Sequence, residues 1–220
     1  KEGCRLLRIS EEKARHLNWY DYFIPENTRP YLRKVFDAII SEEYKLKDNI
    51  YYENYILTTE SKKILMGWHL SLLKNDDGQV TGLIASGEDI TERRSSEHKL
   101  RRLASVIEQA TESVIITSLN GRIEYVNPAF ESISGYTYSD AVGKRPNIIK
   151  SGLQDEPFYK NLWETIIRGK TWTGVFSNRK KNGELYYEDA VIFPIRDSNG
   201  KVINFAAVKR DITNERRLQE

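Results

Sequence analysis

Residues 195–213 read IRDSNGKVINFAAVKRDIT, and this stretch decides the fold because much of it occurs twice. Residues 73–91 read LKNDDGQVTGLIASGEDIT, and the two stretches align without a gap at an offset of 122. Six of the 19 aligned positions are identical, including the Asp-Ile-Thr at 89–91 and at 211–213. Self-similarity at a fixed offset indicates a repeated structural unit. The sequence therefore predicts two copies of one module.

The second copy is divided by three Asn-Gly pairs, which are typical of tight turns between antiparallel strands. They predict strands at 114–117, 123–126, 172–180, 184–195 and 202–208. Between the second and third of these strands, apolar residues from Phe158 to Ile167 recur at the spacing of one helix face. We expect this helix to begin after Asp155 and to end at Gly169, because both are suitable capping residues.

The first copy shows only the later part of this pattern. The sequence predicts a helix at 27–41 and strands at 50–57, 64–73 and 80–90. Residues 1–17 read as two short helical pieces, the second of them beginning after Ser10, and no pair of strands precedes them. We therefore expect the first module to lack its first hairpin.

The segment between the copies, residues 91–112, contains neither Gly nor Pro and predicts a helix. Leu100, Leu103, Ile107 and Ala110 follow the a/d spacing of a coiled-coil seam. Such a stripe is explained either by packing on the helix's own domain or by a homodimer through the linker helices. We expect the first module at 1–93, the linker helix at 94–112, the second module at 113–213 and the start of an exit helix at 214–220.

Several motifs of the second copy belong together in one family. They are IEYVNPAF at 123–130, SGY at 134–136, GK at 143–144, WTG at 172–174 and DIT at 211–213. With the order of strands and helices, they resemble PAS sensor domains. The resemblance implies an α+β fold of two PAS domains, each a five-stranded antiparallel sheet with helices on one face, the first lacking its first hairpin. It also implies a sensory input module, most simply of a sensor histidine kinase, with a diguanylate cyclase or phosphodiesterase as the second choice of parent.

Asp89 and Asp211 are expected to end a strand and begin a helix. Their carboxylates can cap free amide groups at the helix start and so couple the sheet to the helix. With Thr91 and Thr213, they are the predicted signal relay. A purely structural role in stabilising the helix start is compatible with this interpretation.

The resemblance lets cofactors be checked residue by residue. Light-sensing LOV domains bind FMN through a cysteine, and the corresponding loop, RPNIIK at 145–150, has none. Haem-binding PAS domains use a histidine near the long helix, and the second copy has no histidine. His16 and His69 of the first copy read as ordinary surface or sheet residues. LOV-type FMN and haem are therefore not expected.

The second copy is similar to the flavin-binding redox sensors of the family, which implies FAD as its cofactor. Trp163 would flank the flavin ring, and Asn178 would offer its amide to the polar edge of the ring. Two positions depart from that subfamily, because Pro146 replaces an acidic residue and Ile115 replaces a hydroxyl. A large aromatic residue on the apolar face of a helix is also commonly a core residue. The first copy has Ile56 in place of Asn178 and is the poorer candidate.

Composition excludes other classes of function. The chain has 34 Lys and Arg against 32 Asp and Glu, a net charge of +2, which does not favour a nucleic-acid partner. The single cysteine, Cys4, forbids an internal disulfide or a cysteine-rich metal site and favours a reducing, cytoplasmic setting. No apolar run is long enough for a membrane helix and no signal peptide opens the chain, so we expect no membrane contact.

The sequence shows no catalytic set of residues. Glu184, Glu188 and Asp189 lie close together, but they read as exposed acids of an alternating strand. We therefore expect this chain not to be an enzyme, and any catalysis to belong to a C-terminal output domain of the parent. The competing hypothesis is that both modules are only dimerisation or docking spacers. A sensor needs a cavity of about 300 Å³ or more, whereas a spacer should be solidly packed.

Overall fold

The computed structural model describes residues 2–40 and 50–219 of the chain. The chain divides into two compact units, at residues 1–99 and 100–220. Each unit is an antiparallel sheet with helices, so the predicted α+β class is confirmed.

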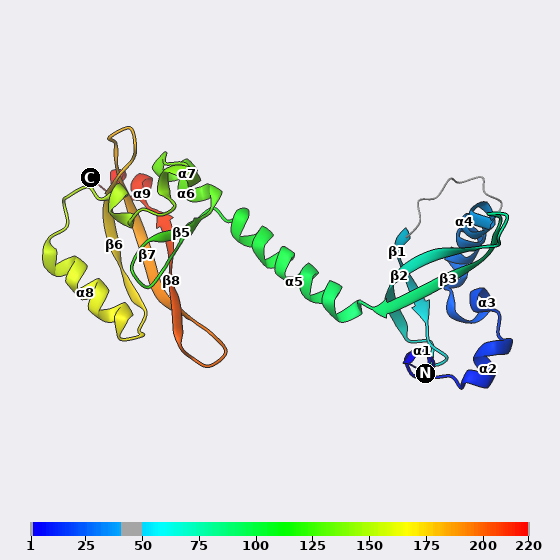
Figure 1. Cartoon of the computed structure of the whole chain (residues 1–220). Coiled ribbons are helices and arrows are strands. Elements are labelled where there is room, and N and C mark those ends of the chain that lie inside the picture. The colour runs from blue at the N-terminus through cyan, green and yellow to red at the C-terminus, as the bar shows by residue number, and fades with distance from the viewer. Residues whose placement is uncertain (1, 41–49, 220) are drawn as a thin grey trace. The chain divides into compact units, whose positions relative to one another are not determined.

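The second unit contains a five-stranded sheet in the order β5-β4-β8-β7-β6, with every neighbouring pair antiparallel (Figure 1). Its strands are β4 (Ser113–Thr117), β5 (Ile123–Val126), β6 (Trp172–Arg179), β7 (Leu185–Arg196) and β8 (Val202–Asp211). Its helices are α6 (Pro128–Ser134), α7 (Tyr138–Ala141), the 3-10 turn η2 (Pro146–Ile149), α8 (Glu156–Ile167) and α9 (Thr213–Arg217). The predicted strands are confirmed, although β8 continues three residues past the predicted end at Val208.

Capping residues determine where the helices of this unit begin and end. The Asp155 side chain accepts a hydrogen bond from the backbone N–H of Phe158 and so begins α8. After α8, Gly169 adopts a φ of +75°, which suits a glycine just past the end of a helix. Asn127 caps α6 in the same way as Asp155 caps α8, and Pro128 follows it in the first helical position.

The core of the second unit lies between the helices and one face of the sheet. Alternate residues of the strands and one stripe of α8 are buried there, which matches the two-residue and 3.6-residue periods of strands and helices. The largest of these side chains are Phe130, Leu162, Ile166, Trp172, Phe176 and Phe205.

The described part of the first unit contains a three-stranded sheet in the order β1-β2-β3. Its elements are α1 (Glu2–Leu7), α2 (Glu11–His16), α3 (Trp19–Phe23), the 3-10 turn η1 (Glu26–Thr28), α4 (Arg29–Ile40), β1 (Ile50–Leu57), β2 (Lys63–Lys74) and β3 (Val80–Asp89). The helix expected at 27–41 begins two residues later, because residues 26–28 form a 3-10 turn, and its predicted last residue lies outside the described residues. Residues 2–40 form no strand.

The linker segment forms the helix α5 (Thr91–Glu108). This helix ends before Ala110, so the predicted seam loses that position. Leu100 and Leu103 of the seam are exposed in the chain. Among the described helices, none is long and apolar enough to cross a membrane. The residue boundaries proposed for the two modules and the linker stay a prediction.

Candidate functional site

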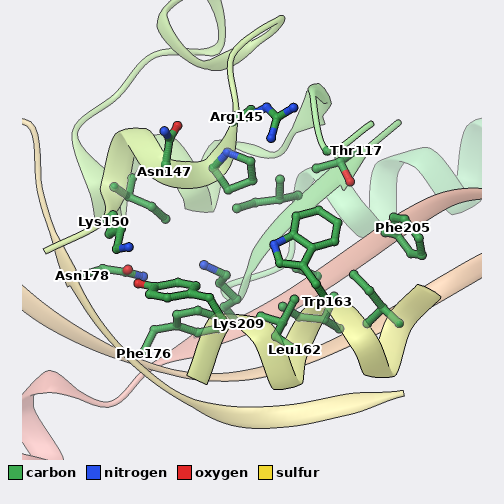
Figure 2. A pocket seen from close by; sticks show the side chains of 18 of the residues that line it. Thr117, Arg145, Asn147, Lys150, Leu162, Trp163, Phe176, Asn178, Phe205 and Lys209 are labelled. Carbon is green, nitrogen blue, oxygen red and sulfur yellow. The ribbon is translucent and has the colours of Figure 1, made fainter. Parts of the chain in front are cut away.

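A cavity of about 320 Å³ lies in the second unit between α8, the η2 loop and the sheet (Figure 2). This volume is at the lower end of the range for small-molecule pockets. Its walls are mostly apolar or aromatic, with a few polar groups. The lining side chains include Ile115, Thr117, Arg145, Pro146, Asn147, Lys150, Tyr159, Trp163, Phe176, Asn178, Phe205, Ala207 and Lys209.

The structure brings the two predicted cofactor residues to this one pocket. Figure 2 shows the Trp163 indole projecting from α8 into the cavity, and the Trp163 and Phe205 ring centroids lie 6.3 Å apart. A glycine is required at position 121, because its φ is +72° and a Cβ there would lie 2.8 Å from the indole. Asn178 lines the pocket from β6 and is buried. The two departures from the flavin-binding pattern, Pro146 and Ile115, also line the pocket.

A buried polar cluster lies behind the pocket wall. The Lys209 ammonium lies 3.1 Å from Glu188 Oε2, and Asn178 Nδ2 donates a hydrogen bond of 2.6 Å to the same oxygen. Both charged side chains are almost inaccessible, with exposed fractions of 5% and 1%. Lys209 and Asn178 line the cavity, so the cluster connects the pocket with the interior of the sheet. We call these three residues the buried polar cluster.

The expectation that Glu188 is an exposed strand acid is wrong. On β7, Tyr186 and Glu188 face the interior while Asp189 is exposed. A charged residue at an interior strand position is stable only when it is paired, and Lys209 on the neighbouring strand provides the partner. Sequence reasoning also missed Lys209. Its position in phase with Phe205 and Ala207 on β8 is the signal that could have found it.

The loop at one side of the pocket carries two further cations, Arg145 and Lys150. Both are exposed, and neither forms an ion pair with a carboxylate in the described part of the chain. The Lys150 ammonium lies 4.0 Å from the centre of the Tyr159 ring. A backbone bridge between Lys150 and Asn178 holds the loop against β6.

Two tyrosines near the pocket keep protonated hydroxyl groups at neutral pH. Burial raises the pKa of Tyr159, which lines the cavity. Burial, followed by the nearby Glu188 carboxylate, raises the pKa of Tyr186. The Tyr159 hydroxyl is therefore a hydrogen-bond donor, not an anion, toward anything that enters the pocket.

The first unit has its own cavity of about 660 Å³, with different chemistry. Its walls come from α3, α4 and the sheet, and none of its described lining residues carries a charge. At the offset of 122, the buried polar cluster is replaced by Ile56, Met66 and Gly87. A Cβ at Gly87 would lie 2.4 Å from Trp68, so the glycine makes room for an indole in this unit.

The four predicted relay residues form the same arrangement at the end of each sheet. Asp211 Oδ1 accepts a hydrogen bond from the Thr213 N–H at 2.9 Å, and Thr213 Oγ1 accepts one from the Tyr187 N–H at 3.0 Å. In the first unit, Asp89 accepts a hydrogen bond from the Thr91 N–H at 2.9 Å. Thr91 Oγ1 accepts one from the N–H of Leu65, which is the residue equivalent to Tyr187.

The two junctions differ in the burial of their threonines, and in the second unit a buried charged residue lies next to the junction in the sequence. Thr213 is buried, whereas Thr91 is exposed. Tyr187, which contacts Thr213, directly precedes Glu188 of the buried polar cluster. A continuous path therefore connects the pocket with the start of α9. Lys209 hydrogen-bonds to Glu188, Glu188 is covalently bonded to Tyr187, and Tyr187 hydrogen-bonds to Thr213.

His16 and His69 are exposed and do not line either cavity, which agrees with their interpretation as surface or sheet residues. In the described ranges, no group of three or more His, Cys, Asp or Glu side chains could hold a metal ion.

Comparison with known proteins places both units in one family. A family model described as PAS domain matches residues 3–92 and 111–214. The chain is 28% identical over 116 residues to the nitrogen fixation regulatory protein of Klebsiella oxytoca, covering 53% of this chain and 23% of the relative. It is 27% identical over 134 residues to the hybrid signal transduction histidine kinase L of Dictyostelium discoideum, covering 61% and 8%.

Among solved structures, the PAS domain of a protein from Colwellia psychrerythraea is 22% identical, with a TM-score of 0.46. That match covers 53% of this chain and 98% of the other. The matched regions span less than a quarter of the length of the two relatives above.

Proposed function

Because the chain belongs to the PAS domain family, we propose that its second unit is a sensory input domain that responds to a small ligand or a redox change. The relatives include a regulatory protein and a signal transduction histidine kinase, which supports a sensory input role in a signalling protein. A histidine kinase is our preferred parent, with a diguanylate cyclase or phosphodiesterase as the second choice. The catalytic activity would then belong to an output domain and not to these residues.

The observation that carries this proposal is the cavity of about 320 Å³ between core side chains of α8 and the sheet on one side and the exposed loop residues Arg145 and Lys150 on the other. Core side chains are normally close-packed, and an unfilled pocket of this size beside them forfeits many favourable contacts. A domain that serves only as a spacer has no reason to keep it. The cavity therefore favours the sensor over the spacer hypothesis.

The buried polar cluster suggests how occupancy would reach the exit helix. A ligand that contacts Lys209 or Asn178 would change the hydrogen bonds that these residues make to Glu188. Glu188 follows Tyr187 in the chain, and the Tyr187 N–H hydrogen-bonds to Thr213. A shift of β7 against β8 would then alter the Asp211 junction and the position of α9. The two states are the arrangements of β7, β8 and α9 before and after this shift. A ligand biases the equilibrium between them by the difference in its affinity for the two arrangements.

The residues of the pocket fit a flavin. The apolar and aromatic walls suit the ring, with Trp163 beside it and Asn178, Asn147 and Thr117 as polar groups. Arg145 and Lys150 would bind the phosphates of FAD. Bound flavin would supply reversible oxidation and reduction. The protein's own contribution would be to bind the ring, to exclude water from it and to connect it with Glu188.

Incubation of the 220-residue chain with FAD, followed by gel filtration, tests the flavin proposal. We expect FAD to elute with the protein, and Trp163→Ala to weaken its retention by about tenfold, because a ring contact worth about 1.5 kcal/mol is lost. Trp19→Ala, which removes a tryptophan from the cavity of the first unit, is the matched control. Absence of flavin from the protein peak, or an equal loss in both variants, would refute the proposal.

We also propose that α5 mediates a homodimer. Leu100, Leu103 and Val106 on this helix are more than 60% exposed in the single chain, and a second copy of the helix would cover them. Leu103→Glu should raise the dimer dissociation constant by about tenfold or more, because a buried leucine contributes about 1.5–3 kcal/mol. Arg101→Glu places the same side chain on α5 outside the seam and should have little effect. Sedimentation equilibrium measures both, and a monomeric wild type excludes the dimer.

A further inference from the structure

We propose that the pocket of the second unit selects an aromatic ligand that carries a negative charge. This inference rests on the proposed sensory function of the pocket and adds the chemical class of the ligand. The class includes flavin nucleotides, whose charge is on phosphate, and smaller aromatic acids, whose charge is on a carboxylate.

The charge of the pocket wall is the first argument. Arg145, Lys150 and Lys209 all line the cavity, whereas no Asp or Glu is among its described lining residues. Glu188 lies behind the wall and balances the charge of Lys209. Arg145 and Lys150 make no ion pair within the part of the chain that the structure describes, so they leave an excess of positive charge at the pocket. An anion can be held there without burying an uncompensated charge.

The aromatic walls are the second argument. Trp163, Phe176, Tyr159 and Phe205 line the cavity from α8, β6 and β8. The Lys209 ammonium lies 4.7 Å from the centre of the Phe176 ring, and Lys150 lies over Tyr159, so two of the cations contact rings of the pocket wall. A planar ligand with a charged substituent can stack on the rings while its charge meets the cations.

The first unit provides the contrast within the same chain. Its cavity has aromatic walls too, including Trp19 and Trp68, but it lacks lysine and arginine among the described lining residues. Among the described lining residues, Asn54 alone carries a side-chain amide, and its oxygen accepts a hydrogen bond of 2.7 Å from the Trp68 indole. The cations of the second pocket are therefore not a general consequence of the fold.

Calorimetric titration of the 220-residue chain with 2-naphthoate and 2-naphthamide separates charge from shape, because the two probes share their rings. We expect naphthoate to bind about tenfold more tightly, since each of two exposed cations contributes up to about fivefold. Lys150→Gln should reduce this preference by about threefold to fivefold. Lys160→Gln, which removes an exposed cation from α8 outside the pocket, should leave it unchanged. The preference should also shrink in ~1 M NaCl, where the screening length falls to about 3 Å.

Two equivalent variants locate the binding site. Ala207→Leu narrows the second pocket and should abolish naphthoate binding, whereas Ala85→Leu, at the same position of the first unit, should not. Equal affinity of the two probes, or a preference unaffected by Lys150→Gln, would overturn the anion inference while leaving the pocket a ligand site. Binding of neither probe, together with failure to retain FAD, would instead count against the proposed function itself. Charge-selective binding without FAD retention would support the inference and identify an aromatic acid as the class.

Discussion

Lys209→Met should lower the free energy of unfolding of the second unit by about 3–5 kcal/mol, because it leaves the Glu188 carboxylate buried without a cation. The double variant Glu188→Met/Lys209→Met should recover most of this loss, since an apolar pair can replace a buried ion pair at little cost. The first unit already has Met66 in the place of Glu188. Native-state hydrogen exchange at the amides of β7 and β8 reports on this unit alone.

An exposed ion pair provides the control for Lys209. Arg217 and Glu184 lie 3.0 Å apart, with exposed fractions of 57% and 41%. Arg217→Met should therefore cost less than about 1 kcal/mol. Two results would contradict this expectation: Lys209→Met costs no more than Arg217→Met, or the double variant is as unstable as the single one. In either case, the loss of stability would not come from leaving Glu188 buried without a cation.

Asn127→Ala should destabilise the second unit by about 4 kcal/mol, because it removes four hydrogen bonds of a fully buried side chain. The Asn127 Oδ1 accepts from the N–H groups of Val114 and Phe130, at 2.9 and 3.1 Å. Its Nδ2 donates to the carbonyl oxygens of Ile107 and Glu112, at 3.2 and 2.9 Å. One side chain thus joins the end of α5 to β4 and α6.

Asn127→Asp keeps the acceptor toward Val114 and Phe130, but it loses both donors and buries an unpaired carboxylate against the carbonyl oxygens of Ile107 and Glu112. We therefore expect a loss of stability at least as large as that of Asn127→Ala, with the fastest hydrogen exchange near the end of α5. Asn182→Ala, in an exposed hairpin turn, should cost less than about 1 kcal/mol. A cost for Asn127→Ala as small as that for Asn182→Ala would contradict this account.

Most of the fold could be predicted from local signals. The Asn-Gly turns define the hairpins of the second unit, and Asp155 caps a helix where the sequence placed it. These signals act over a few residues, so they can be recognised in the sequence without knowledge of the tertiary structure. Ala110 shows the limit, since the spacing of apolar residues continues past the point where α5 ends.

The chemistry of the pocket could be predicted only in part. Trp163 and Asn178 were found through the resemblance, and both line one cavity. Glu188 and Lys209 were missed because each looks like an ordinary charge in an alternating strand. Their burial depends on pairing across β7 and β8, residues that lie 21 positions apart. The exchange of the Glu188–Lys209 ion pair for Met66 and Gly87 in the first unit likewise appears only when the strands are aligned.

The central claim is that the second pocket is a sensory site that is read out at the Asp211 junction. Hydrogen exchange at the amides of Tyr187, Ile212 and Thr213, with and without saturating FAD, tests it most directly. The account predicts that exchange there changes by about fivefold or more, the lower end of typical coupling between two sites. The equivalent amides of the first unit, at Leu65, Ile90 and Thr91, should not change. Bound FAD with unchanged exchange at the Asp211 junction would contradict the claim.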